Sequence, residues 1–299
     1  MRVAITGASG FIGSALTSHL RASGAEVVHL VRRPTRAAHE RQWDPDSVRL
    51  DVESIADCDG IVTLHGAGIG DRRWTPSYKK ELVTSRTHGT RAVAAALATL
   101  AGAGHGLRWV SGSAVGYYGD RGEEVLTESS GPGTGFISEL VQAWEGATEP
   151  AAQAGVRVAH ARTGIVLSPR GGALAPVLRM IRFGVGGPLG RGRAWWPWIT
   201  LHDQVRALAF LVENPEVTGA VNLASPGEAR QGDVVRAIAA AMHRPALLPA
   251  PTPALRLVLG EFAGEVLSSQ RLHPDVLLRQ GFVFEHADLD TAARWVTNR

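Results

Sequence analysis

The beginning of the chain carries the pattern that most restricts its fold. A run of small and β-branched residues at 3–6 leads directly into Gly7, Gly10 and Gly13, and an amphipathic helical pattern follows at 12–22. In such a unit the first glycine allows a tight turn, the second lets a phosphate approach the backbone, and the third lets the helix pack on the strand. The free N–H groups and positive dipole end of the helix favour an anion. The residues expected to cradle the phosphates of a dinucleotide are Gly7, Ser9, Gly10, Phe11, Ile12 and Gly13.

The rest of the chain predicts an α/β fold with a doubly wound parallel sheet, because short β-branched runs alternate with helical patterns. Further strands are expected at 26–31, 60–65, 107–111, 156–162 and 220–223. Further helices are expected at 76–100, 135–154 and 203–213, and Pro150 should kink or split the second of these. We expect a Rossmann domain at 1–225, with Gly/Pro-rich substrate loops at 171–198, and a smaller, mostly helical substrate lobe at 226–299.

Composition excludes several classes of protein. A net charge of +3 with scattered arginines is too weak for a nucleic-acid surface. No apolar run approaches the roughly 20 residues of a membrane span, and no His, Cys and Asp cluster has metal-ligand spacing. The single Cys58 cannot form an intrachain disulfide, and a first strand starting at Arg2 leaves no room for a signal peptide. We therefore expect a cytoplasmic protein without a metal.

Two arginines end the second predicted strand. Roughly 20 residues beyond such a glycine pattern, an acid would bond the ribose 2′-hydroxyl of NAD(H), whereas an arginine accommodates the 2′-phosphate of NADP(H). Arg32 and Arg33 stand there, and no acid does. The predicted cofactor is therefore NADP(H), with Arg32 as the main ligand and Arg33 as a second. The alternative is a pair of solvated arginines at a strand end.

Several further segments resemble the extended short-chain dehydrogenase/reductases, and more narrowly an atypical epimerase-like subfamily often named nucleoside-diphosphate-sugar epimerases. The similar segments lie at 6–13, 64–68, 73–74, 80–86, 111–119, 144–145, 162–164, 186–190, 198–199 and 202–203, with a helical C-terminal module from 244 to 282. The resemblance spans nearly the whole chain. It implies a Rossmann fold, a nicotinamide cofactor and a small-molecule substrate.

This chain departs from the superfamily at its catalytic pair. Typical members carry a Tyr-x-x-x-Lys pair whose lysine lowers the pKa of the tyrosine. Here Phe136 and Leu140 occupy the corresponding positions. The only lysines are Lys79 and Lys80, and the residues four places before them are threonine and proline. No Tyr-x-x-x-Lys pair therefore exists, and catalysis needs another proton donor.

The remaining candidates follow predicted strands. Ser113 corresponds to the superfamily serine that bonds the reacting oxygen, and Tyr117 or Tyr118 can supply the missing phenol. A loop serine bonded to local backbone and two packed aromatic rings are the alternatives. The resemblance also places cofactor contacts at Leu64, His65, Gly66, Glu81, Arg86 and Ile165. For His65 a hydrogen-bonded filler is favoured over a titratable group, and for Glu81 and Arg86 a solvated helix face is equally acceptable.

The sequence therefore predicts an NADP(H)-binding oxidoreductase or epimerase-like protein that acts on a small polar substrate. That substrate can be linked to a nucleotide or a sugar. A non-catalytic NADP(H)-sensing protein is the main alternative, and an assembly partner recruited through the C-terminal helices is a third. The helices near Glu81 and Val141 can also pair in a homodimer.

Overall fold

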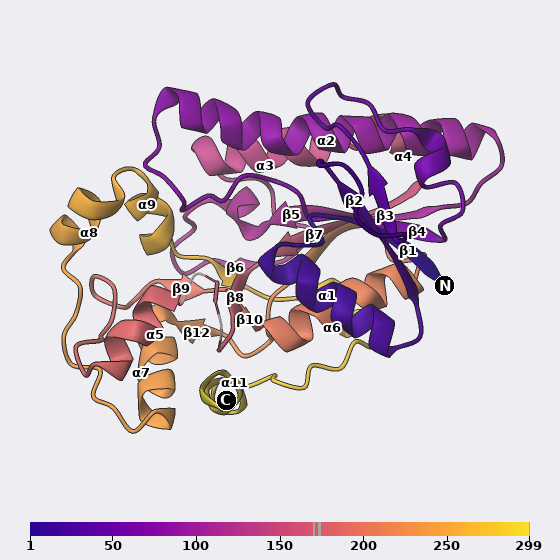
Figure 1. Ribbon diagram of the computed structural model, residues 1–299. Helices are drawn as coiled ribbons and strands as arrows, with labels where there is room; N and C mark the ends of the chain where they lie inside the picture. The colour runs from indigo at the N-terminus through magenta and orange to yellow at the C-terminus, as the bar shows by residue number, and fades with distance from the viewer. Residues whose placement is uncertain (170, 173–174, 299) are drawn as a thin grey trace.

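A seven-stranded parallel sheet forms the centre of the molecule (Figure 1). The computed structural model describes residues 1–169, 171–172 and 175–298; residues 173 and 174 of the predicted substrate loops lie outside the described residues. The strands run in the order β11-β7-β5-β4-β1-β2-β3, and every neighbouring pair is parallel. Their bounds are β1 Arg2–Thr6, β2 Glu26–Val31, β3 Glu40–Gln42, β4 Gly60–Thr63, β5 Arg108–Ala114, β7 Arg157–Thr163 and β11 Gly219–Leu223. This confirms the doubly wound α/β fold.

Helices cover both faces of the sheet (Figure 1). On one face lie α1 (Phe11–Ala22) and α6 (Leu201–Glu213), and on the other α2 (Pro76–Gly102), α3 (Phe136–Gly146) and α4 (Glu149–Gln153). Buried aliphatic residues of the strands alternate between these two cores, as the pleat requires. The helix predicted at 135–154 is split into α3 and α4, and Pro150 stands in the first turn of α4, where its missing N–H costs nothing.

One predicted strand end and one missed strand bear on the site. Strand β4 ends at Thr63, so Leu64 and His65 follow the strand instead of belonging to it. The short edge strand β3 was not predicted. Its three residues, Glu40, Arg41 and Gln42, are polar and partly exposed, so they lack the apolar pattern by which the other strands were found.

A second group of elements gathers beside the carboxyl edge of the sheet (Figure 1). Its apolar core joins α5 (Ala175–Arg182), β9 (Trp195–Trp196) and β10 (Trp198–Thr200) to α7 (Gln231–Ala241) and α11 (Leu289–Thr297). The other short elements are η1 Val52–Ser54, η2 Val115–Tyr118, β6 Val125–Leu126, β8 Ile165–Leu167, β12 Ala229–Arg230, α8 Thr252–Leu259, α9 Phe262–Leu267, β13 Arg271–Leu272 and α10 Asp275–Arg279. Segments from before and after residue 225 therefore share one core.

Candidate functional site

The strand order reverses between β1 and β4, because the chain runs from β1 outward through β2 and β3 and then returns to the other side of β1. Ligands of open α/β sheets bind at the carboxyl ends of the strands at such a reversal. Gly7 follows β1 there with φ +68°, and a Cβ on it would lie 2.6 Å from the Leu64 carbonyl oxygen at the end of β4. Only glycine therefore lets these two strand ends meet.

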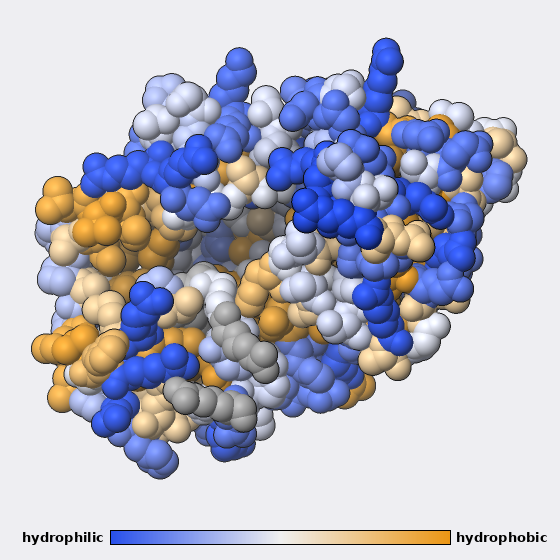
Figure 2. Space-filling model, in the orientation of Figure 1, coloured by the Kyte–Doolittle hydropathy of each residue, from blue (hydrophilic) through white to orange (hydrophobic). Residues whose placement is uncertain are grey.

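The first turn of α1 is left open. Gly10 is its N-cap and has no side chain, and no acidic residue stands in the first turn. Within the described part of the chain, no group accepts a hydrogen bond from the backbone N–H of Phe11, Ile12 or Gly13. The neighbouring Ser9 and Gly10 are exposed, and Figure 2 shows a deep recess between the sheet and the C-terminal elements. Unpaired helix N–H groups at an open turn fit a phosphate.

The two adjacent arginines at the end of β2 differ in what they bind. Arg33 forms a bidentate pair with Glu40 of β3, with N–O distances of 2.6 and 2.9 Å. This pair lowers the pKa of Glu40 to about 2. Arg32 is exposed and forms no hydrogen bond or ion pair with any described residue. Arg32 is thus available to a ligand, whereas Arg33 already has a carboxylate partner.

His65 is a hydrogen-bonded part of the structure beneath the cradle. Its Nδ1 lies 2.8 Å from the Thr6 hydroxyl, and its Nε2 lies 3.3 Å from the Arg86 carbonyl oxygen. Its ring packs edge-on against Trp43. Burial, together with the nearby Arg86 and Arg32 charges, lowers the pKa of His65 to about 4, so the ring is neutral at physiological pH.

Arg86 is a buried cation without a carboxylate partner among the described residues. It is 8% exposed, and its guanidinium donates to the carbonyl oxygens of Leu82 and Ala67, both at 3.0 Å. Its Nε has no partner, and burial lowers the pKa of Arg86 to about 10. The exposed Gly66 covers it: a Cβ there would lie 3.1 Å from the Arg86 side chain. The guanidinium therefore lies directly below the surface next to the cradle.

Two other predicted cofactor contacts are positioned less directly. Glu81 is exposed and lies 3.5 Å from Arg72, and it forms no ion pair with the buried Arg86. Ile165 begins β8, where it pairs with Trp198 of β10 and is partly buried.

Ser113, at the carboxyl end of β5, belongs to a buried polar network. Its hydroxyl donates to Glu145 Oε1 at 2.5 Å. Glu145, from α3, accepts two further hydrogen bonds from Arg162 of β7, both at 2.8 Å. The loop-serine alternative, in which the hydroxyl bonds only local backbone, does not describe this contact. Burial alone would raise the pKa of Glu145, but the Arg162 hydrogen bonds and charge outweigh it and lower that pKa.

The two tyrosines after β5 have different environments. Tyr118 is fully buried; its hydroxyl donates to Asn222 Oδ1 at 2.7 Å and accepts from Arg162 at 2.9 Å. Tyr117 is partly exposed, and the Arg162 guanidinium carbon lies 3.5 Å from its ring centre. Of the two phenols, only that of Tyr117 has no hydrogen-bond partner among the described residues. Tyr118 is therefore part of the internal network, and Tyr117 is the phenol that can meet a ligand.

The positions of the missing catalytic pair are apolar. Phe136 begins α3, and Leu140 is buried one turn further on. A lysine does approach this place from another helix: Lys79 Nζ of α2 lies 5.0 Å from the Phe136 ring centre. It is paired with Glu261 near the start of α9.

Glu145, Arg162 and Asn222 were missed as site residues by the sequence reasoning. Two of them, Glu145 and Arg162, stand in segments that resembled the epimerase-like subfamily, and this was the only available signal. Nothing in the local sequence pattern showed that α3 and β7 bring Glu145 and Arg162 together with Ser113.

No group of His, Cys, Asp or Glu suited to a metal ion occurs within the described residues. No helix there is long and apolar enough to span a membrane.

The parallel sheet, the reversal of strand order and the glycine turn define an α/β fold of the Rossmann type. The chain belongs to the NAD-dependent epimerase/dehydratase family, whose model matches residues 3–224; a model for a domain of unknown function, DUF1731, matches residues 250–296. The chain is 42% identical to the epimerase family protein Mb2239 of Mycobacterium bovis, over 99% of this chain and 98% of the relative.

Two experimental structures are similar over the whole chain. The human epimerase family protein SDR39U1 (isoform 2), crystallised with NADPH, superposes with a TM-score of 0.91 at 31% identity and covers 100% of both chains. A nucleoside-diphosphate sugar epimerase from Corynebacterium glutamicum superposes with a TM-score of 0.81 at 32% identity, over 99% of this chain and 58% of that one.

Proposed function

We propose that this protein is an NADP(H)-dependent oxidoreductase of the epimerase/dehydratase family. The observation that carries the choice of cofactor is the difference between the two arginines: Arg32 is free beside the open turn, and Arg33 is bound to Glu40. The human relative crystallised with NADPH supports the same choice. The bound dinucleotide would supply or take up a hydride.

The residues of this chain fit that cofactor in three places. The N–H groups of Phe11, Ile12 and Gly13 would hold the pyrophosphate, and Arg32 would hold the 2′-phosphate. Leu64 and Gly66 would line the crevice at the end of β4. Arg86, beneath Gly66, would add a positive charge that no described carboxylate neutralises. Ser9 and Ile165 would border the site, whereas Glu81 would act at its periphery.

The binding of NADPH and NADH to matched variants tests the cofactor assignment. In Arg32→Ala we expect NADPH affinity to fall about 10- to 100-fold, the value of a charge-assisted hydrogen bond, and NADH affinity to stay unchanged. Arg33→Ala, the adjacent control, should bind both cofactors as the wild type does. Equal affinity of the wild-type protein for NADPH and NADH, measured by fluorescence titration, would refute the assignment.

For catalysis we propose Ser113 and Tyr117 as the groups that meet the reacting oxygen of a small polar, nucleotide- or sugar-linked substrate. Tyr118 would orient the Arg162 guanidinium through the hydrogen bond that its buried hydroxyl accepts. Incubation with NADP(H) and pools of alcohols, carbonyl compounds and sugar nucleotides, followed through the nicotinamide absorbance, tests for turnover.

A non-catalytic NADP(H)-sensing protein is the second candidate. Phe136 and Leu140 at the positions of the usual pair favour it, because neither side chain can exchange a proton. Tight NADPH binding with no change in absorbance in any pool would support the sensor.

With either function we propose a cytoplasmic location. Cys58 is a buried free thiol, and burial raises its pKa to about 12, which suits that location.

A further inference from the structure

We propose that Ser113 and Glu145 form a proton relay that leads from the substrate toward a groove that Glu145 also lines, and that this relay replaces the missing Tyr-x-x-x-Lys pair. The proposal rests on the oxidoreductase function proposed above. It assigns Glu145, for which the sequence offered no role, as a positioning residue that acts through Ser113.

The Ser113 hydroxyl has only one proton, and that proton points to Glu145 Oε1, 2.5 Å away. The Ser113 oxygen can therefore accept a hydrogen bond from a substrate, but it cannot donate one while the bond to Glu145 is intact. A substrate hydroxyl satisfies this geometry, whereas a carbonyl oxygen does not. The natural ligand of Ser113 in this state is thus an alcohol.

Glu145 is held as an anion that can take up the Ser113 proton. Arg162 donates two hydrogen bonds to its carboxylate, and the Ser113 hydroxyl donates a third. The other titratable groups near it are His160 of β7 and Glu149 of α4, while Tyr118 lies on the far side of Arg162. The charges of Arg162 and Glu145 therefore neutralise each other until Glu145 takes up a proton.

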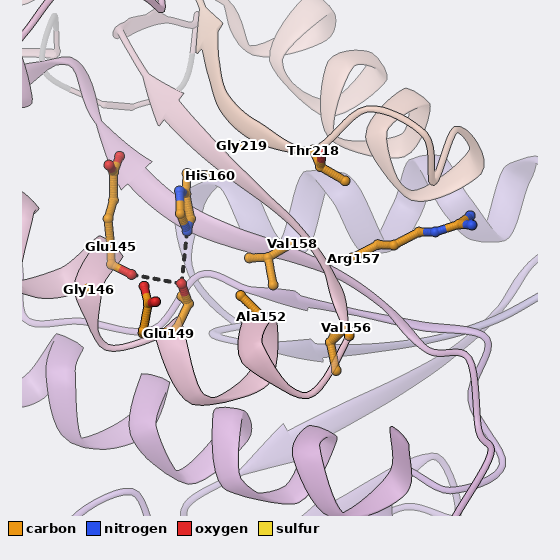
Figure 3. Close-up of a pocket in the computed structure, with 12 residues that line it drawn as sticks. Glu145, Gly146, Glu149, Ala152, Val156, Arg157, Val158, His160, Thr218 and Gly219 are labelled. Atoms are coloured by element: carbon orange, nitrogen blue, oxygen red, sulfur yellow. Dashed lines mark hydrogen bonds between the residues drawn. The ribbon is translucent and has the colours of Figure 1, made fainter. Parts of the chain in front are cut away.

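Glu145 also lines a groove, shown in Figure 3, together with His160, Thr148 and Glu149. Its volume of about 540 Å³ admits many water molecules. The Thr148 hydroxyl donates to the Glu145 carbonyl oxygen at 2.7 Å, so the contact of 3.0 Å to His160 Nε2 requires His160 to donate there. His160 Nδ1 then carries no proton, and burial lowers the pKa of the ring, so His160 stays neutral and holds the Thr148 hydroxyl in place.

The proposed step balances as follows. The proton of the substrate hydroxyl moves to the Ser113 oxygen as the Ser113 proton moves to Glu145, and the hydride leaves the same substrate carbon for NADP⁺, the oxidant. The products are a carbonyl compound, NADPH and one proton on Glu145. Water in the groove then takes up that proton. Carbonyl reduction would require the reverse path, starting from protonated Glu145.

Ser113→Ala tests the relay without disturbing the buried ion pair, and Ser111→Ala, two residues earlier on the same strand, is the matched control. With the alcohol that gives turnover in the pools, Ser113→Ala should lower kcat by about 10²- to 10⁴-fold, the contribution of positioned acid–base catalysis. NADPH affinity should not change. Ser111→Ala, whose hydroxyl bonds only a carbonyl at 3.4 Å, should keep wild-type kcat.

The pH profile separates a relay from a structural role. In the wild-type protein, alcohol oxidation should decline only at pH values below the usual titration range of a glutamate, because the Arg162 hydrogen bonds outweigh burial and lower the pKa of Glu145. Carbonyl reduction should rise as the pH falls. Glu145→Asp should keep that acidic limb with a lower kcat, and Glu145→Gln should abolish it.

Wild-type kcat in Ser113→Ala, or an unchanged acidic limb in Glu145→Gln, would overturn the relay. The absence of turnover in every pool, with intact NADPH binding, would overturn it in favour of the sensor. Failure of NADPH to bind would instead refute the proposed function itself.

Discussion

The glycine turn and the Ser113 network lie at the same edge of one sheet, but they differ in whether their polar groups have hydrogen-bond partners. At the turn, the backbone N–H groups of Phe11, Ile12 and Gly13, the Arg32 guanidinium and Arg86 Nε all lack a partner among the described residues. In the network, each hydrogen of Ser113 and Tyr118 and each Glu145 oxygen is paired. Unpaired donors indicate a place for a ligand, whereas complete pairing indicates groups held in a fixed geometry.

This difference has an energetic side. The open turn loses little stability when a ligand is absent, because water can bind its exposed backbone N–H groups and Arg32. A buried ion pair has no such substitute, so the loss of one partner leaves an uncompensated charge in the interior. We therefore expect substitutions in the network to change stability, and substitutions in the turn to change binding.

Arg162→Met should give the largest effect. It leaves Glu145 buried without its cation, and the free energy of unfolding should fall by about 3–5 kcal/mol in urea denaturation. The double variant Glu145→Leu/Arg162→Met should recover most of this loss, because no charge remains buried. NADPH affinity should stay within about twofold in any variant that folds; a large loss of affinity would mean that turn and network are not independent.

His65 should make the turn side of the molecule sensitive to acid. Its pKa is about 4 in the folded protein and 6.5 in an unfolded chain, so protonation favours the unfolded state. The stabilisation is complete above pH 6.5 and declines as the pH falls, by roughly 3 kcal/mol at pH 4. His65→Asn cannot titrate and should lack this part of the slope in chemical denaturation between pH 7 and 4. Parallel slopes for both proteins would show that His65 is not held neutral.

Tyr118→Phe should give the smallest of the three effects. It removes one hydroxyl and leaves Asn222 Oδ1 and one Arg162 N–H without a partner, which costs about 1–2 kcal/mol. Tyr117→Phe removes a hydroxyl that has no partner among the described residues and should change the midpoint of thermal unfolding hardly at all. Equal destabilisation by the two changes would contradict the distinction between the tyrosines.

The sequence predicted the turn well because its determinants are local. Gly7, Gly10 and Gly13 lie within seven consecutive residues, and the helix start that they expose follows at once. Of the network, the sequence singled out only Ser113 and Tyr118. Glu145 stands 32 residues away from Ser113, and Tyr118 and Asn222 are separated by 104. A charged residue on a helix or strand has the same pattern whether it is solvated or paired in the interior, so only tertiary structure could reveal these partners.

Arg32 and Arg33 also show that a sequence pattern does not reveal the tertiary partners of a charged residue. Both follow one β-branched strand, and the sequence named both as phosphate ligands. What separates them is Glu40, which belongs to β3, the one strand of the sheet that was not predicted. Because β3 was not predicted, the sequence could not show that Arg33 has a carboxylate partner and Arg32 has none. The C-terminal lobe was similarly hard to delimit, because its core combines α5 and the Trp195–Trp198 region with α7 and α11.

Lys79 joins α2 to the start of α9 through Glu261, and Lys80 is its only companion among the lysines of the chain. Nearly all the positive charge of the molecule is carried by guanidinium groups, which do not react with the usual amine-directed reagents. Apart from the α-amino group, a fluorophore or cross-linker aimed at amines would thus attach at one short stretch of one helix, beside the Trp74 and Phe136 rings. Without any engineering, this protein offers a nearly unique chemical handle at the border between its sheet and its C-terminal elements.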